Sequence, residues 1–394
     1  MRTVYNLSIF LYLFTIRISS LANPKAKKWI RGRKNIFKKI EESLNKAQNV
    51  VWFHCASLGE FKQGETIIQE YKSKYPDHKI LLTFFSPSGF EATKDSHLSD
   101  WIFYLPADTT SNAKKFIKTI RPIKAIFIKY EFWFNYMNEL KKNEIPFYSA
   151  STIFRNNQLF FKYKWWGKQL KNATHFFLQN KQSAHLLKSI GINNYSIVGD
   201  SRFDNVLSRK EAPSRTPLIE LFSKNKKTII CGSTWPKDED LLIKYIKAHS
   251  KNNYIIAPHE MYYISKIQQE TNGLLYSNAS KKNITKQNVL IIDNIGLLSN
   301  IYQYGDIAYI GGGFGKGIHN ILEATAFGLP VIFGPKYQKY NEAIILKNKK
   351  GAVPISNYNE LISAINNFEN FEKSIAYNYI KENSGATKKI IDLL

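Results

Sequence analysis

The amino-acid sequence predicts an α/β protein made of two facing, doubly wound, Rossmann-like domains. After residue 48, short runs rich in β-branched and aromatic residues alternate with longer amphipathic stretches. The runs are apolar on both faces, which is typical of parallel strands covered by helices on each side of a sheet. The alternation lapses near 203–226 and then resumes, and a length of 394 residues also fits two domains.

An apolar segment opens the chain, over residues 4–22, and only Asn6 and Arg17 interrupt it. Its length is close to the roughly 20 residues of one membrane crossing. Dense positive charge follows, at Lys25, Lys27, Lys28, Arg31, Arg33, Lys34, Lys38 and Lys39. Such charge resists translocation and attracts anionic headgroups, so residues 1–24 are predicted to anchor the protein on the cytoplasmic face of a membrane. A signal peptide is the competing interpretation, and spanning or interfacial placement both stay open.

The first domain is predicted over residues 25–205. Its expected strands are VVWFHCAS, KILLTFFS, WIFYLPA, KAIFIKYE, PFYSAS, THFFLQN and YSIVGD. A polar stretch with Pro213 and Pro217 predicts a linker or linker helix over 206–226. The second domain, 227–394, has the runs TIICGST, NYIIAPHE, VLIIDN, IAYIGGG and PVIFGP, and its last helix is a candidate to pack back on the first domain.

The composition limits the partners and the chemistry. Lys and Arg exceed Asp and Glu by 56 − 31 = 25, so an anionic partner is expected: nucleic acid, an acidic membrane or a phosphorylated substrate. Biased codon usage is the alternative explanation for the excess of basic residues. Cys55 and Cys231 are isolated in apolar runs and show no metal-ligand spacing, which predicts buried thiols and no metal site.

Three candidate sites lie in the first domain. Ser57 and Gly59 mark a strand-to-helix turn that sets Glu60 in a first helical turn, where it is either a general base or a helix-capping carboxylate. Lys129 and Glu131 flank Tyr130, so on a strand their side chains would point to the same face. Lys129 either binds an anionic group of a substrate or pairs with Glu131. Arg202, in GDSRFDN, is either a fixed cation in the cleft or an exposed surface residue.

A Gly-rich turn in the second domain is the fourth candidate. The sequence GGGFGKGIHNILE follows a strand, includes Gly313 and Lys316, and opens a helix near His319–Asn320. Glycines allow a phosphate close to the backbone, and Glu323 is placed to hold ribose hydroxyls. The spacing matches neither the dinucleotide nor the Walker A pattern, and a plain tight turn is the alternative.

The ordered set of motifs resembles the Kdo transferases of lipopolysaccharide assembly, in a Bacteroidetes-like form (Kdo is 3-deoxy-D-manno-oct-2-ulosonic acid). The matching segments span residues 25 to 345 and are WIRGRK, HCASLGE, FFSPSG, YLPAD, YEFWFN, LQN, GDSRFD, GST (with Ser233 and Thr234), APH, DNIGLL, GGGFGKGIHNILE and FGP. The resemblance implies the glycosyltransferase B fold. It also implies transfer of Kdo from CMP-Kdo to a lipid A precursor of the lipid IVA type at the inner membrane, with inversion and without metal or cofactor.

The resemblance also implies residue roles. Glu60 falls on the family's general base, with Lys129 and Arg202 near the reacting groups. The CMP-binding positions fall on Pro258, His259, Ile295, Gly296, Leu297, Asn320, Ile321, Leu322 and Glu323. The enterobacterial pattern has glutamate, lysine, histidine and arginine where this chain has Lys129, Arg202, Trp235 and His259, respectively.

Two alternative functions differ from this expectation. Another membrane-associated glycosyltransferase of the same fold would use a different nucleotide sugar and lipid acceptor. A basic nucleic-acid-binding protein is a more remote alternative, because the sequence has no recognisable nucleic-acid-binding motif and its charge is concentrated next to the apolar segment. No nucleic-acid partner is therefore expected.

Overall fold

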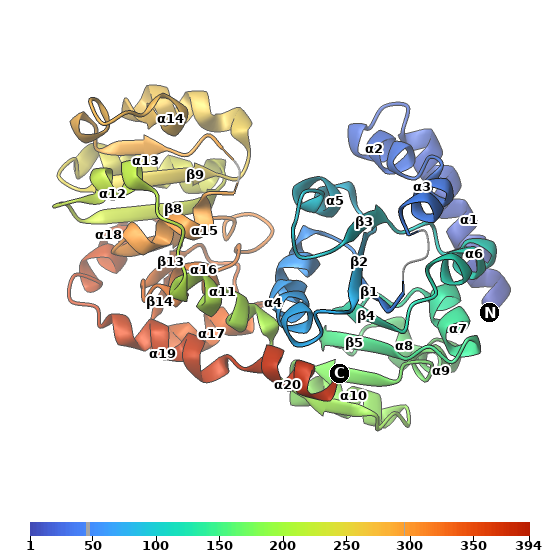
Figure 1. The fold of residues 1–394 in the computed structure, drawn as a ribbon. Helices are drawn as coiled ribbons and strands as arrows, with labels where there is room; N and C mark the ends of the chain where they lie inside the picture. Colours follow the sequence, from blue (N-terminus) through green and yellow to red (C-terminus); the bar gives the residue numbers. More distant parts are fainter. Residues whose placement is uncertain (45–47, 295) are drawn as a thin grey trace. The chain divides into compact units, whose positions relative to one another are not determined.

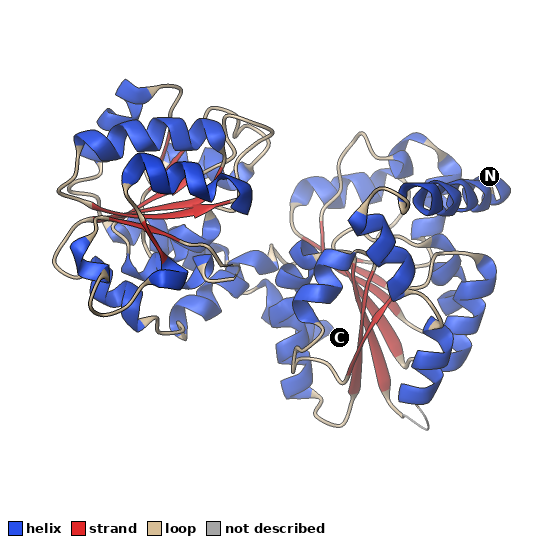
Figure 2. Cartoon of the chain, turned by 90° about the horizontal axis from the view of Figure 1, so that it is seen from above, coloured by secondary structure: helices blue, strands red, loops and turns tan. Residues whose placement is uncertain are grey.

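The computed structural model describes residues 1–44, 48–294 and 296–394. The chain forms two compact units, Met1–Asn205 with Ser384–Leu394 and Val206–Asn383. Each unit contains one seven-stranded sheet with helices on both faces (Figures 1 and 2). All strand pairs in both sheets are parallel. The predicted pair of doubly wound α/β domains is confirmed.

The sheet of the first unit has the strand order β3-β2-β1-β4-β5-β6-β7. The chain therefore reverses direction across the sheet between β1 and β4, where ligands bind in doubly wound folds. All seven predicted runs form strands: β1 (Val50–Cys55), β2 (Lys79–Phe84), β3 (Trp101–Tyr104), β4 (Lys124–Ile128), β5 (Phe147–Thr152), β6 (His175–Leu178) and β7 (Tyr195–Ile197).

Both faces of this sheet are buried, which explains the continuous apolar runs. In β1, Trp52 packs into the core on one face, and Val51 and Phe53 pack into the core on the other. The covering helices are α1 (Arg2–Ser19), α2 (Pro24–Gly32), α3 (Ile36–Ser43), α4 (Leu58–Lys74), α5 (Pro87–Thr93), α6 (Thr110–Ile120), α7 (Phe134–Lys142), α8 (Leu159–Lys162), α9 (Lys164–Leu170), α10 (Lys181–Ser189), the start of α11 (Ser201–Glu211) and α20 (Ala386–Leu393).

The last helix, α20, packs against α4 inside the first unit. The Thr66 and Thr387 hydroxyls are hydrogen-bonded at 2.9 Å. The Asp204 carboxylate accepts hydrogen bonds from the backbone N–H groups of Gly385 and Thr387, at 2.5 and 2.9 Å. A carboxylate at this position satisfies N–H groups that a helix leaves unpaired at its start.

The second unit has the order β10-β11-β9-β8-β12-β13-β14. The five predicted runs form β8 (Thr228–Thr234), β9 (Asn253–Pro258), β11 (Val289–Ile291), β12 (Ile307–Ile310) and β13 (Val331–Phe333). The sequence reasoning missed β10 (Leu274–Leu275) and β14 (Ala352–Pro354). The helices are α12 (Pro217–Ser223), α13 (Pro236–Ala248), α14 (Ile264–Thr271), α15 (Leu298–Ile301), α16 (Leu322–Ala326), α17 (Asn341–Asn348), α18 (Tyr358–Asn367) and α19 (Lys373–Asn383). The stretch predicted as a linker holds the end of α11 and all of α12, and it groups with this unit.

The N-terminal segment is helical and packs on the first unit. Tyr5 of α1 is buried, and its hydroxyl donates to the Asp108 carboxylate at 2.5 Å. No single helix in the described residues is long and apolar enough to cross a bilayer; α1 and α2, bent by 120°, meet the criterion only as a pair, by length and composition. Arg33, counted above among the cations, points inward and donates to the carbonyls of Leu105 and Phe85.

Candidate functional site

Glu60 lies in the first turn of α4, directly after the carboxyl end of β1. Its side chain is only 13% exposed, and Lys129 Nζ lies 3.9 Å from Glu60 Oε1. The Ser57 hydroxyl donates to Glu60 Oε2. Ser57 is the N-cap residue of α4, but its hydroxyl bonds the Glu60 side chain and makes no capping hydrogen bond to the helix backbone. These contacts hold the carboxylate in one orientation at the sheet edge.

Lys129 reaches Glu60 because the backbone turns sharply at the end of β4. The strand ends at Ile128, and Lys129 has a left-handed φ of 72°. The prediction that Lys129 and Glu131 share a strand face is therefore wrong, because neither residue is in the strand. The bend is held by hydrogen bonds from Lys129 N to Ala150 O, at 2.8 Å, and from Ser149 Oγ to Lys129 O, at 3.1 Å. A non-glycine residue in this region is costly, and such strain occurs often at functional sites.

Glu131 shares the electrostatic environment of Glu60. Burial raises the pKa of the Glu131 carboxyl to about 7, the negative charge of Glu60 adds to the increase, and Lys129 opposes it. Near neutral pH, Glu131 therefore exists in both protonation states. Neighbouring carboxyl groups whose environments differ in this way are typical of acid–base sites.

His54 and Trp133 support this cluster from behind, and sequence reasoning did not single them out. His54 is fully buried, accepts a hydrogen bond from Trp133 Nε1 at 3.1 Å, and contacts Thr83 Oγ1 at 2.9 Å through Nδ1. Burial lowers the pKa of His54 to about 3. A neutral imidazole in β1 thus ties the segment after β4 to the sheet.

Arg202, in the first turn of α11, pairs with Asp200. Arg202 Nη2 lies 2.7 Å from Asp200 Oδ2, and the Arg202 backbone N–H donates to Oδ1 at 3.0 Å. Gln63 of α4 also donates to Asp200 Oδ1, at 3.1 Å, and to Ser151 Oγ, at 2.8 Å. Gln63 is on the same helix as Glu60, so the Arg202 pair and the Glu60 cluster are attached to one element. Gln63, Ser151 and Asp200 were not predicted from the sequence.

The Gly-rich turn of the second unit, residues 311–317, follows β12. A Cβ on Gly311 would lie 2.3 Å from Ser233 O, so only glycine fits beside the end of β8. Asp238 of α13, fully buried, accepts hydrogen bonds at 2.9 Å from the backbone N–H groups of Gly312 and Trp235. This carboxylate, which sequence reasoning missed, fixes the turn against the start of α13. Lys316 is exposed on the same turn.

Trp235, His259 and His319 gather beside this turn. Trp235 Nε1 donates to His319 Nε2 at 2.9 Å, and the His259 ring stacks on both partners with centroid distances of 4.7 and 4.5 Å. Trp235 and His259 are two of the positions where the chain departs from the enterobacterial pattern. Trp235 and His259, two of the residues that depart from this pattern, thus lie in direct contact with each other. Pro258, the last residue of β9, is buried next to them.

The remaining predicted donor-site residues differ in accessibility. Gly296 is exposed with a φ of 100°, Leu297 caps α15, and Ile295 lies outside the described residues. Ile321 and Leu322 have buried side chains, whereas Asn320 is exposed. The helix begins at Leu322 and not near His319–Asn320, because His319 N still bonds Gly311 O at 3.1 Å within the turn. Glu323 is therefore the second helical residue. Within the described residues, no three His, Cys, Asp or Glu side chains form a group that could hold a metal ion.

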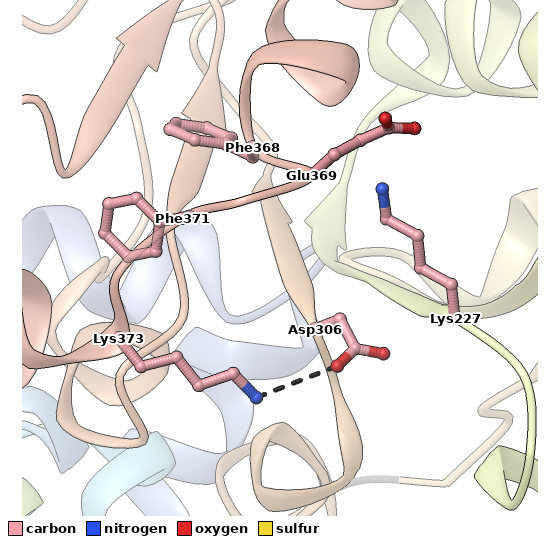
Figure 3. Close-up of a pocket in the computed structure, with 6 residues that line it drawn as sticks. All are labelled: Lys227, Asp306, Phe368, Glu369, Phe371 and Lys373. Carbon is pink, nitrogen blue, oxygen red and sulfur yellow. Dashed lines mark ion pairs between the residues drawn. The ribbon is translucent and has the colours of Figure 1, made fainter.

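A separate pocket of about 470 Å³ lies at the opposite, amino-terminal edge of the second sheet (Figure 3). It is lined by Lys227, Asp306, Phe368, Glu369, Phe371 and Lys373. Lys373 Nζ pairs with Asp306 Oδ1 at 3.7 Å, and Asp306 Oδ2 accepts the Thr228 N–H at 3.0 Å. Asp306 thus has a partner at each carboxylate oxygen, and none of the residues that line this pocket is a predicted site residue.

Comparison with known proteins shows which enzymes the chain resembles. Residues 30–205 match the family model described as 3-deoxy-D-manno-octulosonic-acid transferase (kdotransferase). The chain is 26% identical over 361 residues to the 3-deoxy-D-manno-octulosonic acid transferase of Rickettsia felis, covering 88% of this chain and 77% of the relative. The enzyme of the same name from Aquifex aeolicus is 25% identical, with coverages of 85% and 90%. The chain is thus similar to Kdo transferases over most of its length.

These similarities make the chain a glycosyltransferase enzyme, as the motifs predicted. The matched segment contains Glu60, Lys129, Glu131 and Arg202. Among solved structures, the UDP-GlcNAc 2-epimerase of Neisseria meningitidis bound to UDP-GlcNAc has a TM-score of 0.61 at 14% identity, covering 87% of this chain and 98% of the epimerase. That likeness shows the shared two-domain fold alone.

Proposed function

We propose that this glycosyltransferase moves Kdo from CMP-Kdo to a lipid A precursor of the lipid IVA type, during lipopolysaccharide core assembly. Transfer proceeds with inversion and without a metal, and Glu60 is the general base. Similarity to Kdo transferases supports the identity of the transferred sugar. The basic surface and the Glu60 cluster support an anionic donor and an activated hydroxyl acceptor.

The observation that carries this proposal is the environment of Glu60. Its carboxylate is mostly buried at a sheet edge, is oriented by the Ser57 hydroxyl, and lies 3.9 Å from Lys129. A general base needs a fixed carboxylate within reach of the hydroxyl that it deprotonates. A cation beside the base stabilises negative charge as the bond to the donor breaks.

The reaction balances as a single displacement. The acceptor O–H bond breaks and its proton goes to Glu60, while the oxygen bonds the anomeric carbon of Kdo. The bond from that carbon to the CMP phosphate breaks, and CMP leaves with the electron pair. His319, beside the Gly-rich turn, is the proposed donor to the CMP phosphate, whereas Lys129 and Arg202 serve anionic groups of the substrates.

Replacement of Glu60 tests the role of the base. Glu60→Gln keeps the shape of the side chain but removes the proton acceptor, so turnover should fall by about 10²- to 10⁴-fold. Glu70→Gln, an exposed position on the same helix, is the matched control and should stay active. Thermal unfolding with and without CMP checks that both variants fold and bind the nucleotide. A Glu60→Gln enzyme with wild-type turnover would rule out this assignment.

The exposed face of α1 supports placement of the enzyme on the cytoplasmic surface of the inner membrane. Apolar residues form a stripe along one face of α1, and each of them is more than half exposed to solvent: Val4, Leu7, Leu11, Phe14 and Ile18. Tyr5, on another face, is bound to Asp108. Because α1 packs on the first unit through that face, we propose that it lies in the interface and does not cross the bilayer. Exposed cations of α2, among them Lys25, Lys27 and Lys28, are suited to anionic headgroups.

Vesicle flotation tests this placement. The wild-type protein should float with phosphatidylglycerol-containing vesicles, less with phosphatidylcholine alone, and less in high salt. The double variant Leu7→Asp, Leu11→Asp should remain at the bottom of the gradient, whereas Leu159→Asp, an exposed apolar position on α8, should float normally. Equal flotation of the double variant and the wild type would contradict the interfacial helix.

A further inference from the structure

The hydrogen bond between Trp235 and His319 fixes the position of a proton. Trp235 Nε1 lies 2.9 Å from His319 Nε2, and the two rings are inclined by only 10°. An indole N–H can donate but cannot accept. His319 Nε2 must therefore be the acceptor and carries no proton, so the neutral ring has its proton on Nδ1.

His259 contributes to keeping this imidazole neutral, after the larger effect of burial. Its ring covers the nearly coplanar pair, with interplanar angles of 22° to Trp235 and 31° to His319. Burial lowers the pKa of His319 to about 4, and the neighbouring His259 contributes to the decrease. A proton on His319 Nε2 would place an N–H group opposite the Trp235 Nε1–H, so protonation of His319 would break this hydrogen bond.

The pair is attached rigidly to the Gly-rich turn. The His319 backbone N–H donates to Gly311 O at 3.1 Å, and a Cβ on Gly312 would lie 3.0 Å from the His319 ring. The buried Asp238 carboxylate holds the backbone of both Trp235 and Gly312. Among residues 1–44, 48–294 and 296–394, none hydrogen-bonds His319 Nδ1.

We propose that Trp235 is a positioning residue that holds His319 as a neutral imidazole, with its Nδ1–H as a hydrogen-bond donor to an anionic oxygen of the donor nucleotide. The role of this donor rests on the proposed function; the tautomer does not. A neutral donor contributes a directed hydrogen bond without adding charge beside His259.

Nitrogen-15 NMR of histidine-labelled protein tests the tautomer without any substrate. The signals of His319 are assigned by their loss in His319→Gln. In the wild type they should show a protonated Nδ1 and a bare Nε2, without titration between pH 8 and roughly 5.5. Trp235→Phe keeps a stacked ring but removes the indole N–H, so His319 should become a mixture of tautomers. Trp166→Phe, in the aromatic cluster of the first unit, should leave His319 unchanged.

Transfer kinetics test the consequence. Trp235→Phe and His319→Gln should each lower kcat/KM by about tenfold, the loss expected for one hydrogen bond, and the double variant should lose little more. A protonated Nε2 in the wild type, unchanged His319 signals in Trp235→Phe, or fully additive losses would each overturn the inference. Absence of Kdo transfer by the wild type would refute the proposed function, while the NMR spectra would still decide the tautomer.

Discussion

Gly313→Ala should destabilise the second unit through a backbone clash that no rotamer can relieve. A Cβ at Gly313 would lie 2.6 Å from both Cα and N of Gly334, at the end of β13. This distance is roughly 1 Å short of a normal carbon–carbon contact, so β12 and β13 must separate at their carboxyl ends. Separation would also strain the hydrogen bond from Lys336 N to Gly313 O, now 3.0 Å. Overpacking of this kind costs about 1–3 kcal/mol, and the strained hydrogen bond places the expected loss near the upper end.

Gly315→Ala is the matched control on the same turn. Its Cβ would meet only Gly312 O, at 3.5 Å, so its stability should stay within about 0.5 kcal/mol of the wild type. Hydrogen exchange measured by mass spectrometry reports the opening free energy of peptides that contain β12 and β13, which separates this unit from the other. Equal protection in Gly313→Ala and the wild type, or equal losses in both variants, would refute the steric argument.

Two further predictions concern buried charge in the first unit. Tyr5→Phe removes a hydroxyl donor from buried Asp108 and should cost about 1–3 kcal/mol in urea unfolding, whereas Tyr12→Phe should cost little; equal effects would contradict the role of the Tyr5–Asp108 bond. Burial raises the pKa of Glu131 from an ordinary value of 4.5 to about 7, so the protein loses stability as the pH rises from about 4.5 to 7, and the loss is complete above pH 7. Glu131→Gln should therefore match the wild type near pH 4 and be more stable at pH 8, by about 3 kcal/mol at most, in urea unfolding at both pH values. An unchanged difference between the two pH values would show that Glu131 ionises normally.

Much of the fold follows from local sequence patterns. All seven strands of the first sheet were predicted because each lies in an apolar, aromatic-rich run, and the central strands β1 and β4 are buried along almost their whole length. The strands β10 and β14 were missed because their two and three residues carry too little pattern, and pairing with β11 and β13 defines them. The start of α16 was set too early, because the turn that delays it depends on contacts with Gly311.

The candidate site was predicted less completely. Glu60 and the Gly-rich turn stand next to strand ends and are visible in the sequence. The left-handed backbone conformation of Lys129 is not visible in the sequence, because this bend depends on Ser149 and Ala150 of the neighbouring strand. Asp238 resembles an ordinary acidic residue in a first helical turn, and only the fold places it against Gly312. Residues whose role depends on long-range contacts are not recoverable from local spacing.

The most direct test of the central claim is a transfer assay with the purified wild-type protein. CMP-Kdo is generated in the reaction, a tetraacylated lipid A precursor is the acceptor, EDTA is present, and products are read by mass spectrometry. The account predicts a mass gain of one or more Kdo units, with free CMP competing and free UDP not competing. No gain with CMP-Kdo, together with transfer from a UDP-sugar donor, would contradict it.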